Sequence, residues 1–429
     1  MSDVLRKTKK STLYNIFDTA PERPVGNTDN LYFVLDGGFL IHRVIWPKQG
    51  SFGDVYTIYM SSIKKHYGDE VTVVFDGYTE SSVNTKIIER QRRMMKRTSR
   101  EIIFNKSTVL DSQRQFLSNL ANKERFISQL PSHLEKVGIC TFIATNDADV
   151  HVVMTAIETY ENKKQVLVIG QDVDLVVLLT TLTPDDMDIL MLKEGKGKVK
   201  DRFYSSKDLR NSNLVIDCKK SILFLHAISG SDTTSGFYGK GKLQVVQLFN
   251  RNKYLQGIPE IFNDPKSSYT DIKRAVEKFI IALYSNTNEE ENRLNKMRYD
   301  CFNQLVGQAN SAILFSKLLP NTEAAHQHCR RTFHQVQTWQ GEFLNPSSWG
   351  WNLVNKPLTP IYTTKGPAPA KIVSLITCGC NKSCGKKCKC VRANLCCTTL
   401  CKNCRCQSCI NTEALDIVEE EDEEDNDII

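Results

Sequence analysis

The sequence predicts an α/β fold in which a parallel β-sheet is flanked by helices. Four runs of five to seven residues in the first half of the chain are nearly unbroken in hydrophobicity and rich in β-branched or aromatic residues. Such runs are typical of strands buried on both faces of a parallel sheet. Helical patterns separate them, which indicates repeated βα units. The runs are residues 31–35, 71–75, 138–144 and 165–170.

Each of these runs leads into aspartate. The aspartates are Asp36 and Asp76 after the first two runs, Asp147 and Asp149 after the third, and Asp172 and Asp174 after the fourth. In open α/β sheets the ligand crevice lies beyond the carboxyl ends of the strands, so we expect these side chains there. Carboxylates crowded in one crevice repel one another, and bound divalent cations relieve that repulsion. The pattern therefore favours a site for Mg²⁺ or Mn²⁺.

Taken singly, each motif also has a purely structural interpretation. Asp147 and Asp149 fall in the first turn of a predicted helix, where free N–H groups and the helix dipole favour acids. Asp36 and Asp76 precede glycine, and Asp-Gly after a strand is most often a turn. The pair after the fourth run is more specific, because an apolar run follows it at once. The recurrence at four strand ends is what favours a metal site.

A further aspartate, Asp232, opens a glycine-rich turn. Gly239 and Gly241 are interleaved there with Lys240 and Lys242. Glycines one residue apart let backbone N–H groups approach a phosphate closely, and the lysines add positive charge. We expect this turn to bind a nucleic-acid backbone, although an ordinary surface turn has the same composition.

Together these motifs resemble the flap-endonuclease superfamily, whose catalytic domain is a PIN-like α/β fold. That family has single aspartates after its first two core strands, then Glu-Ala-Glu, Asp-x-Asp and a Gly-x-Asp motif before a helix-two-turn-helix. Residues 31–285 match this order, with 147–149, 172–174 and 230–232 in the last three places. The resemblance implies that the seven aspartates hold two divalent cations for phosphodiester cleavage.

Three features depart from that family. Aspartate replaces both glutamates of the Glu-Ala-Glu motif, which shortens these ligands by one methylene. Residues 1–30 precede the first predicted strand, whereas the family usually begins with Met-Gly close to its active site. A strongly basic segment also stands where the family has the helical arch over the threaded strand.

That basic segment is predicted to be a helix over residues 80–103. Its stretch from residue 86 to 100 holds seven bases and a single acid, whereas a solvated helix face normally mixes signs. The bases that share one face are Lys86, Arg90, Arg93 and Arg97. We therefore expect a phosphate-binding stripe, and the resemblance places Lys86 and Arg90 at the scissile phosphate.

Eleven of the 15 cysteines lie between Cys378 and Cys409. Too few core-forming residues stand between them to build a core, so metal or disulfides must hold this segment together. Nothing in the N-terminus looks like a signal peptide, and no apolar run is long enough to span a membrane. We therefore expect a reducing compartment, zinc as the metal and no membrane partner.

The cysteine spacing resembles the tesmin/TSO1-like CXC domain, in which nine cysteines bind three zinc ions and the module binds DNA. The pattern leaves Cys396 and Cys401 over, either of which would be able to replace a neighbour, and Asn411 takes the family's asparagine place. Lys387 stands where the family usually has tyrosine, and there is one copy instead of two. The nine matching cysteines are Cys378, Cys380, Cys384, Cys388, Cys390, Cys397, Cys404, Cys406 and Cys409.

Charge supports a nucleic-acid partner. The formal net charge is +7, and the nine acids of the base-free tail at 416–429 leave +16 for the rest of the chain. The cysteine segment holds seven Lys or Arg and no acid, so we expect Lys386, Lys387 and Lys389 to contact DNA. The tail is expected to be disordered, and to mask the basic module or bind protein partners.

Six regions are expected along the chain. They are an N-terminal extension (1–30), the nuclease-like domain (31–285), a helical extension (286–354), a linker (355–371), the zinc module (372–412) and the acidic tail (413–429). The helical extension contains His326, His328, Cys329 and His334, whose spacing is unlike a familiar zinc site. It also contains Trp339, Trp349 and Trp351, for which anchoring onto the core is favoured over stacking on bases.

These features predict a metal-dependent, structure-specific nuclease that acts on DNA in the nucleus. The basic runs at 6–10 and 90–97 are candidate nuclear localisation signals. The main rival is a DNA-binding regulatory protein that keeps the nuclease fold as an inactive scaffold. A degenerate scaffold would have lost some acids, whereas all seven positions are filled, which favours the enzyme. A third hypothesis makes the cysteine segment a metal-storage or protein-interaction module.

Overall fold

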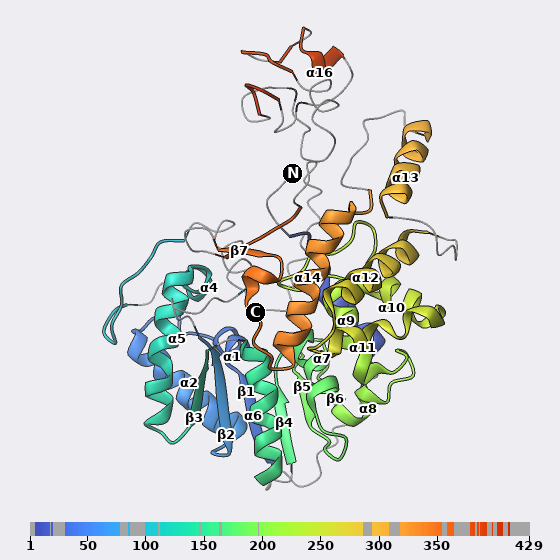
Figure 1. Cartoon of the computed structure of the whole chain (residues 1–429). Coiled ribbons are helices and arrows are strands. Elements are labelled where there is room, and N and C mark those ends of the chain that lie inside the picture. The colour runs from blue at the N-terminus through green and yellow to red at the C-terminus, as the bar shows by residue number, and fades with distance from the viewer. Residues whose placement is uncertain are drawn as a thin grey trace. The chain divides into compact units, whose positions relative to one another are not determined.

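The computed structural model contains two compact units. Figure 1 shows the whole chain, coloured by residue number. One comprises Leu5–Ala275 with His328–Pro360, and the other contains Val276–Gln327 with Ile361–Asp427. The region boundaries expected from the sequence stay predictions. The described residues are 5–17, 19, 31–77, 85, 99–109, 112–145, 147–162, 165–195, 197–285, 294–308, 318–353, 358–363, 378–381, 384–385, 387–392, 397, 401–405 and 411.

A six-stranded sheet forms the centre of the first unit. Its strands are β1 (Leu31–Asp36), β2 (Val71–Asp76), β3 (Cys140–Ala144), β4 (Gln165–Ile169), β5 (Leu190–Lys193) and β6 (Arg202–Ser205). The order is β3-β2-β1-β4-β5-β6, with β1 to β5 parallel and β6 antiparallel to β5. The predicted α/β fold with a mainly parallel sheet is confirmed. The sequence does not predict β5 and β6, because four-residue strands carry little periodicity.

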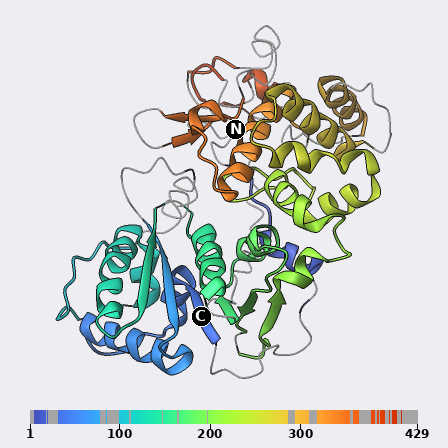
Figure 2. The ribbon, with the colours of Figure 1, turned by 60° about the horizontal axis from the view of Figure 1, so that its bottom comes forward.

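Helices cover both faces of this sheet (Figure 2). One layer contains α1 (Gly37–Arg43), α2 (Phe52–Tyr67), α4 (Gln113–Ser118) and α5 (Leu120–Glu135). It packs on alternate strand residues such as Leu35, Val73 and Ile169. The opposite face packs on α6 (Ala148–Asn162), with α7 (Val173–Leu182) beside it. Burial on both faces is why β1, β2 and β4 appear in the sequence as apolar runs. The same expectation is wrong for β3, which lies at the edge of the sheet and is mostly exposed.

The strand order reverses between β1 and β4. From β1 the sheet continues to β2 and β3 on one side, and from β4 it continues to β5 and β6 on the other. Such a switch point opens a crevice at the carboxyl ends of the strands, where open α/β sheets bind ligands. β1 ends at Asp36, and β4 ends at Ile169, three residues before Asp172. The topology therefore places two predicted ligands at this crevice.

The rest of the first unit is mainly helical. It contains α8 (Ser206–Arg210), α9 (Cys218–Ile228), α10 (Lys242–Arg251), α11 (Ile258–Asn263), most of α14 (Thr322–Trp339) and the β7 (Trp351–Leu353) and β8 (Leu358–Pro360) pair. α12 (Tyr269–Tyr284) leads into the second unit, which holds α13 (Leu294–Gln308) and α16 (Lys389–Arg392). The loop at 229–241 joins α9 to α10. None of the described helices has an apolar stretch long enough to cross a membrane.

Part of the N-terminal extension belongs to the first unit. A 3-10 helix, η1 (Lys10–Ile16), packs with α7 and α10. Leu13, Tyr14 and Ile16 are buried, and Tyr14 Oη donates a hydrogen bond to the backbone oxygen of Gln171 at 2.8 Å. This segment therefore contacts the loop between β4 and α7.

The predicted basic helix does not include residues 99–103. Residues 99–105 have no helical structure. The backbone oxygens of Ser99 and Arg100 accept hydrogen bonds from Asn119 and Asn122 of the α5 region at 2.8 Å and 3.1 Å. These side-chain amides replace helical bonding there. Lys86, Arg90, Arg93 and Arg97 lie outside the described residues.

The tryptophans of the predicted helical extension anchor its part from His328 onward within the first unit. Trp339 is 2% exposed and stacks on His226, with ring centroids 5.4 Å apart. Trp351 is 1% exposed, and Trp349 stacks on Phe333 at 4.6 Å. The anchoring interpretation is therefore confirmed.

The histidines and cysteine of this region contact four different partners. His326 Nε2 lies 2.6 Å from Glu277 Oε1, and His328 Nε2 lies 3.0 Å from Ile228 O. Cys329 Sγ lies 3.3 Å from Ile272 O, and His334 Nε2 lies 3.1 Å from Leu344 O. Each side chain is thus used in a separate packing contact.

Candidate metal centre

Three of the predicted aspartates cap helices where strands have just ended. Each accepts a hydrogen bond from the backbone N–H two residues later, at 2.8 Å for Asp36 and 3.1 Å for Asp147 and Asp172. The structural interpretation of Asp147 at the start of a helix is therefore confirmed, and Asp36 and Asp172 cap helices in the same way. It is compatible with metal binding, because a carboxylate offers two oxygens with several lone pairs. The caps also fix how these carboxylates point.

Electrostatic repulsion couples three of the aspartates at the switch point, Asp36, Asp76 and Asp172. The pKa of Asp36 is raised to about 6, first by burial and then by the charges of Asp76 and Asp172. The pKa of Asp172 is raised by burial and by Asp174 and Asp232. Five of the predicted aspartates thus share one electrostatic environment. Crowded carboxylates of this kind are the condition that a bound cation relieves.

The ammonium of Lys10 lies among three of these carboxylates. Its Nζ is 2.9 Å from Asp232 Oδ1, 3.0 Å from Asp174 Oδ2 and 3.7 Å from Asp172 Oδ2. Burial lowers the pKa of Lys10, but the three negative charges outweigh burial and hold that pKa well above its usual value. The lysine is therefore charged and balances part of the acidic group.

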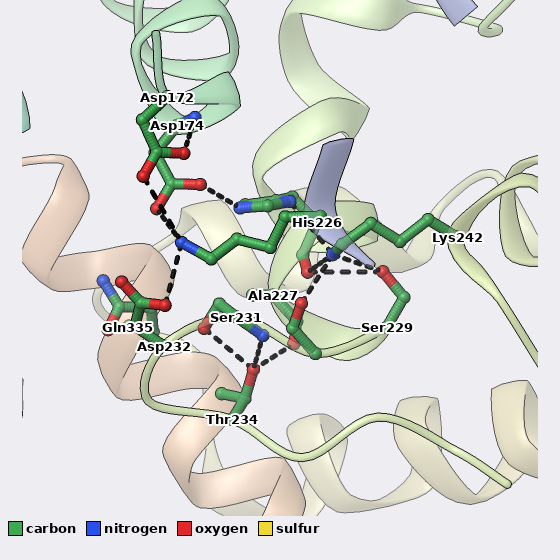
Figure 3. A network of polar contacts seen from close by, with 12 residues as sticks. Asp172, Asp174, His226, Ala227, Ser229, Ser231, Asp232, Thr234, Lys242 and Gln335 are labelled. Carbon is green, nitrogen blue, oxygen red and sulfur yellow. Dashed lines mark hydrogen bonds and ion pairs between the residues drawn. The ribbon is translucent and has the colours of Figure 1, made fainter. Parts of the chain in front are cut away.

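A buried chain of polar contacts continues from Asp174 into the helical region (Figure 3). Asp174 Oδ1 lies 2.8 Å from His226 Nε2, and His226 Nδ1 lies 3.0 Å from Lys242 Nζ. Burial and then the Lys242 charge lower the pKa of His226 to about 4, so the ring is neutral at pH 7. A proton on Nε2 lets the ring donate to Asp174 and accept from Lys242. Both oxygens of Asp174 are therefore held in place.

The position of Lys242 corrects the prediction that it binds nucleic acid. Its side chain is 1% exposed, and Nζ donates to Ser229 Oγ at 3.1 Å and to the His226 backbone oxygen at 2.9 Å. Burial lowers the pKa of Lys242 to about 7. The side chain turns inward because these buried acceptors need a donor. Gly239 and Gly241 are exposed and Lys240 is half-buried, so their predicted role stays a prediction.

Asp147 and Asp149 follow the neighbouring strand end. Ala144, the last residue of β3, is in register with Asp76 of β2. Asp147 comes three residues later and is 6% exposed, and Asp149 is half-buried in the first turn of α6. The sheet thus places the end of β3, which this pair follows, beside the second of the predicted ligands.

The aspartates fit a hard cation by their chemistry, while Lys10 limits where one would bind. Aspartate oxygens are ligands that Mg²⁺ and Mn²⁺ prefer. Across the described residues, which include all seven aspartates, no three of these carboxylates bring ligand oxygens within 4.8 Å of one another. Asp174 and Asp232 surround an ammonium instead. Asp36 and Asp76 are the ligands best placed to receive a cation.

A second candidate site is built from cysteines. Neighbouring Sγ atoms lie 3.6 to 3.9 Å apart, far beyond the S–S bond of about 2 Å. Four sulfurs at about 2.3 Å from a central zinc would be about 3.8 Å apart, which agrees with this spacing. Three groups of four cysteines have this compactness. The buried members are Cys378, Cys384, Cys388, Cys390, Cys397, Cys401 and Cys404.

Cys401 belongs to this cluster, although the predicted ligand set leaves it over. Its Sγ lies 3.6 Å from Cys390 Sγ, and the two share a four-cysteine group with Cys378 and Cys397. Spacing along the chain does not reveal this proximity. Asn411, in the family's asparagine place, donates from Nδ2 to Cys397 Sγ at 3.4 Å. The other predicted ligands and contacts Cys406, Cys409 and Lys386, and the spare Cys396, lie outside the described residues.

Three residues of the centre are absent from the sequence-based prediction. Lys10 stands in a basic run that the sequence assigns to nuclear import, and nothing there distinguishes it from Lys9. His226 interrupts an apolar run in α9, which is a usable signal of a buried polar contact. Gln335 accepts a hydrogen bond from Thr233 Oγ1 beside Asp232, and no local motif marks it.

Comparisons with known proteins give weak likenesses to nucleases. No protein-family model and no curated protein matches this chain. Zinc-bound T5 5′-exonuclease covers 59% of this chain and 83% of its own, at 18% identity and a TM-score of 0.36. The catalytic core of Rad2 with DNA substrate covers 68% and 76%, at 17% identity and 0.36. The eukaryotic junction-resolving enzyme GEN-1 covers 73% and 61%, at 14% and 0.35.

Proposed function

We propose that this chain is a divalent-metal-dependent nuclease that cleaves phosphodiester bonds in DNA. One observation carries the proposal: aspartates from β1, β2, the β4–α7 turn and the α9–α10 loop share one electrostatic environment at the switch point of the sheet. A stable fold has no need of so many mutually repelling carboxylates at one edge. Hard cations are the partners that make this arrangement useful.

The chain's own residues would position the reaction. Asp36 and Asp76 would hold a cation that, when bound, activates water and stabilises the leaving oxygen. Asp147 and Asp149, at the next strand end, would support it. The contacts of Asp174 with Lys10 and His226 fix the neighbouring side of the site. The remaining predicted phosphate contacts are Lys86, Arg90, Arg93 and Arg97.

The cysteine cluster would bind zinc and dock the enzyme on DNA. The sulfur spacing supports zinc as the metal, and three ions are expected from the resemblance. Lys387 and Lys389 are exposed beside buried cysteines, which suits phosphate contacts. The loop from Gly239 to Gly241 would grip the duplex away from the cut. Because its expected substrate is DNA, the protein would act in the nucleus. The acidic tail would bind protein partners.

One observation favours the rival function, an inactive DNA-binding scaffold. Lys10 occupies the centre of Asp172, Asp174 and Asp232, as a positive charge that stabilises the fold without a metal. A scaffold of this kind would bind DNA and leave it uncut in Mg²⁺ or Mn²⁺.

Cleavage of labelled DNA separates the two functions. Flap, bubble, single-stranded and hairpin substrates are incubated with Mg²⁺ or Mn²⁺ and with wild-type protein, Asp36→Asn or Asp69→Asn. Asp69 is a matched control, because its carboxylate is 79% exposed. We expect cutting by the wild type and the control, with a loss of at least about 100-fold in Asp36→Asn. DNA binding without cutting on every substrate would contradict the proposal.

A further inference from the structure

We infer that Lys10 is a permanent part of the proposed nuclease centre, where its ammonium takes the place of one of the two expected divalent cations. The folded chain then binds a single divalent cation, beside Asp36 and Asp76. This inference rests on the proposed function. It makes the segment around Lys10 a positioning element of the site instead of a nuclear localisation signal alone.

The geometry around Lys10 is that of a built cation site. Its Nζ contacts carboxylates from two separate segments, the β4–α7 turn with the first turn of α7 and the α9–α10 loop, at 2.9 to 3.7 Å. The lysine side chain is 21% exposed and that of Asp174 is 2% exposed. A divalent cation would need the same oxygens at about 2 Å. The ammonium and a cation therefore exclude each other here.

The contacts of Asp174 leave little freedom for a metal at this position. Oδ2 faces Lys10 at 3.0 Å, and Oδ1 faces His226 Nε2 at 2.8 Å. The ring is held in turn by Lys242 at 3.0 Å. A cation bound to Asp174 would have to break a buried network in which each group already has its partner.

The chain on both sides of Lys10 is fastened to the same two elements. On one side, Gly236 N donates to Arg6 O at 2.8 Å, and Thr8 Oγ1 donates to Gly230 O at 3.2 Å. A Cβ on Gly236 would lie 2.2 Å from Thr8 Cγ2, so this glycine is needed for the close approach. On the other side, Tyr14 is buried and bonds to the β4–α7 turn.

These anchors indicate that Lys10 is a permanent part of the site. A lysine that a metal ion displaces would be expected on a segment with few contacts to the rest of the fold. Here Lys10 lies between a close-packed threonine and a buried tyrosine, so withdrawal would break contacts at both ends. The charge balance still favours a divalent cation beside the ammonium, because five carboxylates against one ammonium leave a charge of −4.

Counting bound Mn²⁺ on the zinc-loaded full chain tests the inference. Electron paramagnetic resonance follows the titration of wild type, Lys10→Met and Lys9→Met, the exposed neighbour that serves as control. We expect one Mn²⁺ per chain in the wild type and the control, lost in Asp36→Asn. Lys10→Met should gain a second Mn²⁺, or bind it at least tenfold more tightly. Two Mn²⁺ in the wild type, unchanged in Lys10→Met, would overturn the inference and leave the proposed nuclease standing. No Asp36-dependent Mn²⁺ in any protein would overturn both.

A second measurement needs no variant of Lys10. Amine-reactive labelling of the wild type, read by mass spectrometry, compares Lys10 with Lys9 as Mn²⁺ is added. Lys10 should stay protected by its carboxylates at saturating Mn²⁺. Labelling of Lys10 that rises to the level of Lys9 would show that the metal expels it, which contradicts a permanent role.

Discussion

The aspartate centre and the cysteine cluster show two ways of preparing a metal site. The aspartates stand on a rigid sheet whose core is complete without metal, and Lys10 already supplies part of the missing positive charge. Among the described residues, Val391 is the apolar side chain that packs against the cysteines, and their sulfurs lie at the spacing of a zinc–thiolate cluster. Metal is therefore expected to act on a finished fold in the first region and to create the fold in the second.

Zinc removal should give the largest difference between the two regions. Structural zinc sites contribute on the order of 10 kcal/mol to folding, so a chelator should unfold the cysteine cluster completely. The sheet unit should keep its melting temperature, because its core needs no metal. Limited proteolysis and circular dichroism measure the two effects. Loss of the sheet unit on chelation would remove the contrast.

Within the cluster, the number of four-cysteine groups to which a cysteine belongs should determine how much zinc its substitution releases. Cys378 belongs to all three four-cysteine groups, and Cys380 to one. Cys378→Ser should therefore release more zinc per chain than Cys380→Ser, as measured by elemental analysis. Equal losses would show that the sulfurs do not share ions.

Removal of Asp174 should destabilise the sheet unit by roughly 3 to 5 kcal/mol. The change removes the carboxylate partner of the buried His226 and one of the three carboxylates around Lys10. Guanidinium chloride unfolding of Asp174→Ala measures the effect. Asp185→Ala is the control, because Asp185 is 82% exposed and should change stability little. Similar losses in both variants would deny that the network stabilises the fold.

Acid should weaken the first unit through three buried histidines. Burial lowers the pKa of His226, His328 and His334 to about 4 in the folded chain, whereas an unfolded histidine titrates near 6.5. Between these values the unfolded state takes up protons that the folded state does not. The contribution of these histidines to stability should therefore fall as pH drops from about 6.5 to 4, by up to roughly 3 kcal/mol per histidine.

Histidine variants test the origin of that acid sensitivity. His328→Gln should show a shallower dependence of unfolding free energy on pH over this range. His66→Gln, at an exposed histidine, should keep the wild-type dependence. If both variants behave alike, burial of His328 is not the cause.

The smallest expected effect separates two neighbouring lysines. Lys240→Ala should weaken DNA binding slightly and lower the slope of log affinity against log salt by about one. Lys242→Met should leave that slope unchanged, because Lys242 is buried. Fluorescence anisotropy over a salt series measures both. A salt slope that falls in Lys242→Met would restore Lys242 as a phosphate contact.

Much of the sheet and its aspartates could be predicted because the signals are local. A strand buried on both faces is an unbroken apolar run, and the residue after it marks the carboxyl edge. Lys10 could not be found this way, since its contact with Asp174 joins residues 164 positions apart. The burial of Lys242 also escapes local reasoning. Lys242 and Lys240 have the same local sequence pattern. Only the tertiary packing of α9 against the loop distinguishes the buried lysine from the other.

The cysteine cluster shows the same limit at shorter range. Its existence follows from composition, because eleven cysteines without a core need metal or disulfides to hold them. The identity of the ligands does not, since Cys401 comes within 3.6 Å of Cys390 only after the chain has turned back. Spacing therefore predicts a site better than it predicts the members of that site.

Anomalous diffraction at the manganese edge, from crystals grown with Mn²⁺, is the most direct test of the central claim. The expected map has one manganese peak, about 2 Å from carboxylate oxygens of Asp36 and Asp76. Lys10 should still lie between Asp174 and Asp232 in the same crystal. A map with no manganese at any of the seven aspartates would contradict the claim that they form a metal centre.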